Sequence, residues 1–134
     1  MLLRKLCLQW VRFSRIQVYT EKLTGAQKGA KYEDIALLFL LNQGLTLIMR
    51  NYRCKSGELD LLMSEKGALV IVEVRYRKNN RYGSALESVT KTKQARIIAA
   101  TKNYILKHKV DQPIRFDVVA ITGNAQPEWV RNAF

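Results

Sequence analysis

The stretch GELDLLMSEKGALVIVEVRYR, residues 57–77, decides the fold of this chain. It contains two runs rich in aliphatic and β-branched residues, which are typical of strands, separated by Lys66-Gly67. A two-residue turn at Lys66-Gly67 predicts a hairpin in which Glu65 faces Ala68. Because side chains alternate between the two faces of a strand, one face is apolar throughout and is expected to face the core. It carries Leu59, Leu61, Met63, Val70, Val72, Val74 and Tyr76.

The opposite face of this hairpin carries charged residues, and the register places Asp60 directly opposite Glu73. Residues paired in this way have Cβ atoms roughly 4.5–5.5 Å apart, so two carboxylates there repel each other. A divalent cation between them would remove the repulsion, since Mg²⁺ prefers one or two carboxylates with water and phosphate oxygens. Arg75, two residues further along, could then contact a phosphate. The alternative is a solvated charge ladder in which Glu58 pairs with Arg75.

The sequence on either side of the hairpin predicts an α/β domain with a mixed sheet flanked by helices, in the order α-β-β-β-α-β and a last short strand. We expect helices over residues 30–42 and 90–109, and strands over 45–54, 57–64, 68–77, 114–122 and near 129–130. The first helix is so apolar that most of its circumference should be buried, and Gly44 is placed to end it. Residues 1–24 form a basic extension, either an amphipathic helix or a flexible segment, and residues 25–134 form one domain.

The charge of the chain favours a polyanionic partner. Its 134 residues carry a formal net charge of +12, and residues 75–109 contain ten basic side chains and one acidic side chain. Nucleic acid is the first candidate and an anionic membrane surface the second. The nucleic-acid-binding residues expected from the basic helix and the loop before it are Arg77, Lys78, Arg81, Lys91, Lys93, Gln94 and Arg96.

The remaining composition excludes several classes of protein. No uncharged apolar run approaches the roughly 18 residues of a membrane span, and the two cysteines are too few for a disulfide scaffold, so a cytoplasmic location is expected. The single histidine, His108, excludes a multi-histidine metal site. Any metal would therefore be held by carboxylates.

The ordered set of motifs resembles the YraN family of small bacterial proteins, over roughly residues 25–134. The resemblance rests on Gly29-x-x-x-Glu33, Asn51-Tyr52-Arg53, residues 57–62, residues 72–77, Tyr82-Gly83, Lys93-Gln94 and residues 115–119. It implies a restriction-endonuclease-like fold similar to that of Holliday-junction resolvases, within the PD-(D/E)xK nuclease superfamily. Resolvase-like folds often act as dimers, so the resemblance also makes a homodimer an expectation.

The resemblance assigns roles to particular residues. Asp60 and Glu73 match the metal-binding pair, which would hold Mg²⁺ or Mn²⁺, and Glu33 matches an acidic residue that helps to hold water. Arg75 stands where the motif has a lysine, and the two side chains are not interchangeable. A lysine from elsewhere could replace it in space, the candidates being Lys78, Lys91 and Lys93. Gln94 is expected to orient water or phosphate, and Asp117 to pair with a nearby arginine.

Three functions remain open on this sequence. The first is a metal-dependent endonuclease acting on DNA, including branched DNA, with Glu33, Asp60, Glu73 and Arg75 as catalytic residues. The second is a nucleic-acid-binding module with a degenerate nuclease site. The third is an interaction protein that acts through residues 1–20 at a membrane surface or on a protein partner.

Overall fold

The computed structural model describes residues 24–81 and 83–134. Its elements follow the expected order, with a short 3₁₀ turn added before the second helix. They are α2 (Gly25–Asn42), β1 (Thr46–Cys54), β2 (Gly57–Glu65), β3 (Ala68–Arg77), η2 (Leu86–Ser88), α3 (Lys91–His108), β4 (Ile114–Thr122) and β5 (Glu128–Val130). The α/β class and the mixed sheet are therefore confirmed.

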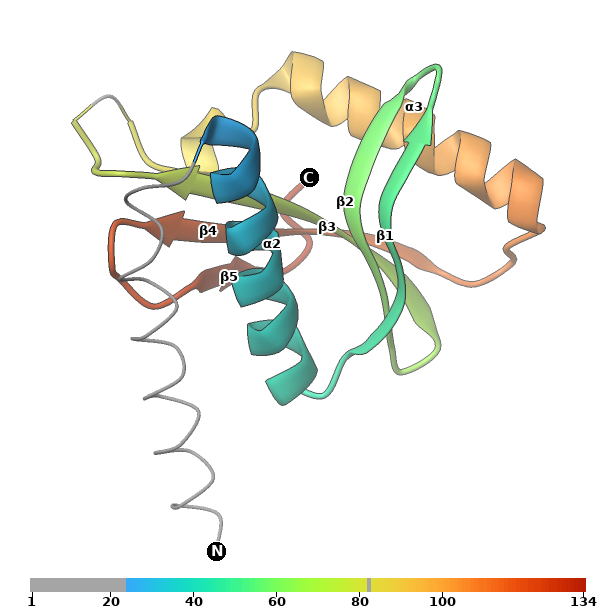
Figure 1. Ribbon diagram of the computed structural model, residues 1–134. Coiled ribbons are helices and arrows are strands. Elements are labelled where there is room, and N and C mark those ends of the chain that lie inside the picture. The colour runs from blue at the N-terminus through green and yellow to red at the C-terminus, as the bar shows by residue number, and fades with distance from the viewer. Residues whose placement is uncertain (1–23, 82) are drawn as a thin grey trace, which may run out of the picture.

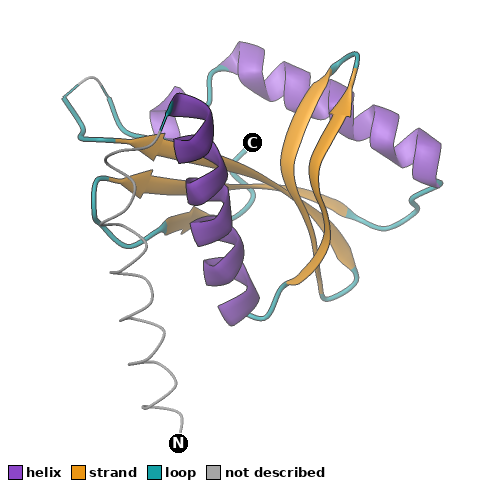
Figure 2. Ribbon diagram, in the orientation of Figure 1, coloured by secondary structure: helices purple, strands orange, loops and turns teal. Residues whose placement is uncertain are grey.

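The five strands form one sheet in the order β1-β2-β3-β4-β5. All neighbouring pairs are antiparallel except β3 and β4, which are parallel and joined through α3. The sheet is strongly twisted, so β1 and β2 run steeply across the direction of β4 and β5 (Figure 1). The two helices lie on opposite faces of the sheet and each covers its own apolar cluster (Figure 2).

The central hairpin has the predicted register. Glu65 pairs with Ala68 and Leu62 with Ile71, and both turn residues have positive φ, 49° at Lys66 and 82° at Gly67. Such a turn matches the right-handed twist of the strands, which explains why a glycine stands in it. The turn therefore sets which residues of β2 and β3 face each other.

Helix α2 begins five residues earlier than predicted. Thr24 accepts a hydrogen bond from the Gln27 amide while the Gln27 side chain accepts one from the Thr24 amide, which makes a capping box. At the other end Gly44, with φ of 97°, ends the helix as predicted. The expectation that most of the helix circumference is buried is wrong, because Leu38 and Leu41 are 45% and 41% exposed.

One expectation about the hairpin faces is also wrong. Near the turn, the face that carries Asp60 and Glu73 further along is apolar, and its residues Leu62 and Ile71 are buried against α3. Leu59 lies in this same cluster, whereas Leu61 lies in the cluster under α2. The strict alternation fails where Asn51 on β1, next to this part of β2, has a left-handed backbone with φ of 51°.

The membrane and extension predictions have different outcomes. Neither helix in the described part of the chain has the length and apolar character needed to cross a membrane. The predicted extension lies outside the described residues apart from Thr24, which belongs to the start of α2. Tyr82 of the Tyr82-Gly83 motif also lies outside them.

Candidate functional site

The site begins where the β2–β3 pairing ends. The paired residues run from Glu65 and Ala68 to Leu61 and Val72, so Asp60 and Glu73 stand at the next step. There the Asp60 side chain replaces a backbone acceptor, because its Oδ2 accepts a hydrogen bond of 2.9 Å from the Val74 amide. The two carboxylates therefore lie at the point where the strands part.

An open cleft of about 460 Å³ lies at this point. Its wall is built from the first two turns of α2, the diverging parts of β2 and β3, and the first turn of α3. The lining residues are Gly25, Lys28, Gly29, Tyr32, Glu33, Asp60, Glu73, Val74, Arg75, Tyr76 and Lys93. The structure thus brings the four predicted catalytic residues, Glu33, Asp60, Glu73 and Arg75, to one cleft.

The acidic pair is electrostatically unfavourable. The Glu73 side chain is only 3% exposed, and burial, followed by the charge of Asp60, raises its pKa to about 8. Burial also raises the pKa of Asp60, against the lowering effect of the Val74 amide and of Lys93. Near neutral pH the pair therefore retains a proton unless another positive charge joins it.

Two basic side chains face Glu73 at different distances. The Lys93 Nζ is 3.2 Å from Glu73 Oε1, whereas the nearest Arg75 nitrogen is 3.7 Å away. Arg75 is tied elsewhere, because its Nε donates a 2.7 Å hydrogen bond to Ser88 Oγ in η2. Lys93 is therefore the closer counter-charge. Glu58 does not pair with Arg75 as the charge-ladder alternative expected, but with Arg53 at 3.1 Å.

Glu33 reaches the cleft from α2. Burial raises its pKa, and the nearby Asp60 charge adds to the effect, while a hydrogen bond with the Asn51 side chain lowers it. Arg50 lies 3.9 Å from Glu33 and binds Asp34 more closely, at 2.6 Å. Glu33 is thus a partly buried carboxylate beside Asp60 with its position set by β1.

The donor set fits a hard divalent cation. Asp60 and Glu73 offer carboxylate oxygens from adjacent strands, which suits Mg²⁺ or Mn²⁺. Within residues 24–81 and 83–134, no group of three or more His, Cys, Asp or Glu side chains is placed to hold an ion. A cation here would therefore take two ligands from the protein and complete its coordination with water and phosphate oxygens.

Of the predicted nucleic-acid-binding residues, only Lys93 lines the cleft. Lys78, Arg81, Lys91 and Arg96 are exposed, and Arg77 is half-buried at the end of β3. Gln94 has a different partner from the one expected, because its side-chain amide donates to the Val89 carbonyl at 3.1 Å. Its role in the structure is to hold the chain that leads into α3.

Sequence reasoning named Glu33 but missed the other side chains and the helix start that build the α2 wall of the cleft. Tyr32 and Tyr76 stack there with ring centroids 3.6 Å apart, and Gly25 and Gly29 leave open space beside the helix. The signal was the capping box Thr24-x-x-Gln27, which moves the helix start to Gly25. Gly25, Gly29 and Glu33 then recur every four residues and share one face.

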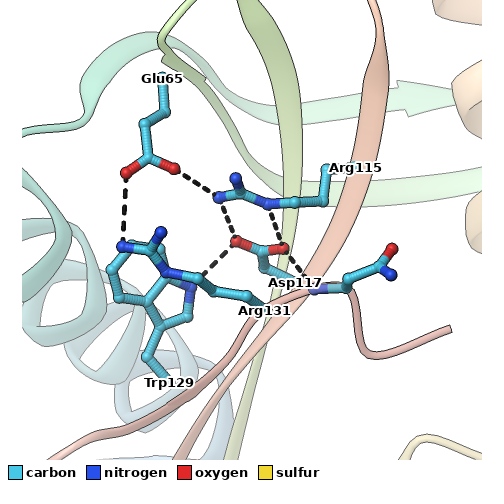
Figure 3. Close-up of polar contacts among 6 residues, drawn as sticks. Glu65, Arg115, Asp117, Trp129 and Arg131 are labelled. Carbon is cyan, nitrogen blue, oxygen red and sulfur yellow. Dashed lines mark hydrogen bonds and ion pairs between the residues drawn. The ribbon is translucent and has the colours of Figure 1, made fainter.

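A second cluster of acidic and basic side chains joins the end of β2 to β4, β5 and the residues after β5 (Figure 3). We call it the Asp117 clasp; its residues are Glu65, Arg115, Asp117, Trp129, Arg131 and Asn132. Asp117 is fully buried and accepts two 2.8 Å bonds from Arg115, as well as bonds from the Trp129 indole and the Asn132 amide at 3.0 Å. The predicted pairing of Asp117 with an arginine is confirmed.

The rim of the clasp is also charge-balanced. Glu65 binds Arg115 at 2.8 Å and Arg131 at 3.4 Å. The Arg131 guanidinium carbon lies 4.0 Å from the centre of the Trp129 ring. Every carboxylate of the clasp thus has arginine partners, and the cluster ties β5 and the C-terminal residues to the sheet.

Known proteins similar to this chain agree on a family. A model of the uncharacterised protein family UPF0102 matches residues 32–121. A UPF0102 protein of Nitrosomonas europaea is 46% identical over 113 residues, covering 83% of this chain and 96% of its own. Another, of Saccharophagus degradans, is 47% identical over 110 residues, covering 81% and 92%. The matched segment 32–121 includes Glu33, Asp60, Glu73, Arg75 and Lys93.

Proposed function

The chain belongs to the UPF0102 (YraN) family, and we propose that it is a metal-dependent endonuclease that hydrolyses phosphodiester bonds in DNA. The observation that carries the proposal is the Asp60–Glu73 pair, two neighbouring carboxyl groups with raised pKa values that line an open cleft. Such a pair lowers the stability of the folded protein, and carboxyl groups with shifted pKa values in a cleft are typical of functional sites. The mixed sheet between two helices is compatible with the resolvase-like fold that the sequence resemblance implies.

Each residue of the cleft has a separate role in the proposed hydrolysis. A divalent cation, when bound, supplies Lewis acidity that polarises a phosphoryl oxygen and activates water. Asp60 and Glu73 would hold this cation, and Glu33 would accept a hydrogen bond from the attacking water. In the reaction a water oxygen forms a new bond to phosphorus, one phosphorus–oxygen bond to a sugar breaks, and the leaving oxygen gains a proton. Arg75 adds positive charge at the edge of the cleft, where negative charge develops.

In this proposal, basic residues outside the lining of the cleft hold the DNA backbone. Arg77, Lys78, Arg81, Lys91 and Arg96 lie on the end of β3, the following loop and the start of α3. Contacts of this kind bind phosphate with little reading of bases, so binding should weaken steeply with salt. The Asp60–Glu73 pair contributes carboxyl groups that DNA binding alone does not need, which favours a metal-dependent reaction over simple binding.

The test compares cleavage by wild type, Asp60→Asn and Glu73→Gln. The asparagine oxygen can still accept the Val74 hydrogen bond, so the strand ends stay in place. Duplex, single-stranded and four-way-junction DNA are incubated with Mg²⁺, Mn²⁺ or EDTA. We expect wild type to cut only with metal, and each variant to lose about a thousandfold in rate. Glu58→Gln is the matched control, because Glu58 is a carboxylate of the same strand paired with Arg53 at the surface.

The outcomes separate the proposal from its alternative. Cleavage by the two variants at the wild-type rate would overturn the assignment of the acidic pair. If wild type binds DNA with strong salt dependence but cuts none of the substrates, the protein is a binding module with a degenerate site. The observation that favours this second function is the hydrogen bond from Arg75 Nε to Ser88 Oγ. Arg75 stands at the motif's lysine position, and this bond directs its side chain towards η2 and away from a phosphate in the cleft.

A further inference from the structure

Lys93 has two possible partners in the cleft. Its Nζ lies 3.2 Å from Glu73 Oε1, and its side chain is 34% exposed, so the ammonium group faces both the buried acid and the open cleft. Lysine is a compact charge on a flexible stem with three donors, and it can change partner by rotating that stem. Arg75 lacks this freedom, because its Nε is bound to Ser88.

The backbone that carries Lys93 is fixed beside the acidic pair. Thr90 caps α3 by accepting a hydrogen bond from the Lys93 amide. On the next turn, the backbone oxygen of Arg96 lies 3.4 Å from where a Cβ of Gly57 would be. Gly57 has a φ of 149°, a backbone conformation that favours glycine, and α3 packs against β2 at this point. The stem of Lys93 can therefore move while its attachment point cannot.

A cation held by Asp60 and Glu73 would compete with Lys93 for the Glu73 carboxylate. We propose that Lys93 is a catalytic residue that exchanges partners, binding Glu73 in the metal-free protein and a non-bridging oxygen of the scissile phosphate once the acidic pair holds a divalent cation. This rests on the proposed nuclease function. Its consequence is that metal and DNA help each other to bind, because the metal frees the ammonium group that then contacts the phosphate.

The experiment separates this exchange from an ordinary backbone contact. Binding of a four-way-junction DNA to wild type, Lys93→Met and Lys91→Met is measured by fluorescence anisotropy, once with Ca²⁺ and once with EDTA. Lys91 is the matched control, since it lies in the same turn of α3 and is exposed. We expect Lys93→Met to weaken binding about tenfold with Ca²⁺ and less than about twofold with EDTA. Lys91→Met should weaken binding equally in both.

Cleavage gives the second readout. With Mg²⁺, Lys93→Met should lower the rate about a hundredfold, whereas Arg75→Met should lower it less. Melting curves followed by circular dichroism confirm that each variant is folded. Equal weakening of DNA binding by Lys93→Met with and without Ca²⁺, or cleavage at the wild-type rate, overturns the exchange while leaving the nuclease function intact. A wild type that neither binds nor cuts DNA overturns both.

Discussion

Glu73 and Asp117 are the two buried acidic residues in the described part of the chain, and they lie on neighbouring strands. In the β3–β4 ladder Val72 pairs with Asp117 and Glu73 with Val118, so the two acids are one step apart. Asp117 accepts four hydrogen bonds within the clasp. Glu73 instead faces a second carboxylate, and its pKa rises to about 8. Burial alone therefore does not mark a functional acid, whereas burial beside a second carboxyl group in a cleft is typical of one.

The largest expected effect is the loss of the clasp. Asp117→Ala leaves the Arg115 guanidinium, the Trp129 indole and the Asn132 amide without their acceptor. Removing one partner of a buried ion pair costs about 3–5 kcal/mol, so urea unfolding should show a loss of this size. Asp111→Ala is the control, because Asp111 also follows α3 in the sequence but is exposed. This replacement should change the free energy of unfolding by less than about 0.5 kcal/mol.

Replacing Glu73 should stabilise the metal-free protein, whereas replacing Asp117 should destabilise it. The unfolded side chain loses its proton near its ordinary pKa of 4.5, the folded one near a pKa of about 8, so the folded state binds more protons between these values. Wild-type stability therefore falls as pH rises through this window. Glu73→Gln cannot ionise, and without metal its Tm should exceed that of wild type by about 5 °C at pH 8 and by less at pH 5.

The same melting experiment also tests whether Glu73 differs from Asp117 in its effect on stability. A Glu73→Gln protein that melts below wild type at pH 8 would make Glu73 a satisfied structural acid like Asp117. Both melting curves are recorded in EDTA, so that no cation stabilises the wild-type pair. Glu65→Gln serves as the matched control, because Glu65 is held by two arginines and its replacement should lower the Tm.

The smallest effect is expected at the rim of the clasp. Arg131 is 52% exposed in its side chain, lies 3.4 Å from Glu65 and covers the Trp129 ring. An exposed ion pair and a surface cation–π contact each contribute less than about 1 kcal/mol. Arg131→Ala should therefore cost about 1 kcal/mol or less in urea unfolding. A loss as large as that of Asp117→Ala would show that the rim, not the buried acid, holds the clasp together.

Much of the fold was predictable because local rules decide it. The turn at Lys66-Gly67 and the period-two pattern set the hairpin register, and this placed Asp60 at the step opposite Glu73. The same logic placed β4 and α3 within a few residues of their observed bounds. Where one turn fixes the register, the pairing of two side chains follows from counting.

The rest depends on contacts between distant segments. Counting along β2 and β3 puts Leu59 and Leu61 on one face and gives no warning that Leu59 lies on the α3 side. The clasp joins Glu65 to residues more than 45 positions away, and no local pattern pairs them. Lys93 was one of three lysines that the sequence offered as neighbours of the acidic pair, and only the packing of α3 on β2 chose among them.

The hydrogen bond from the Val74 amide to Asp60 gives the protein a built-in spectroscopic reporter. An amide proton responds in chemical shift to the charge of the oxygen that accepts it, and Asp60 Oδ2 is only 2.9 Å from the Val74 nitrogen. In a ¹⁵N-labelled sample, one backbone resonance therefore follows the protonation of the acidic pair and the arrival of a cation. That resonance therefore reports protonation of the acidic pair and cation binding in a sample without DNA.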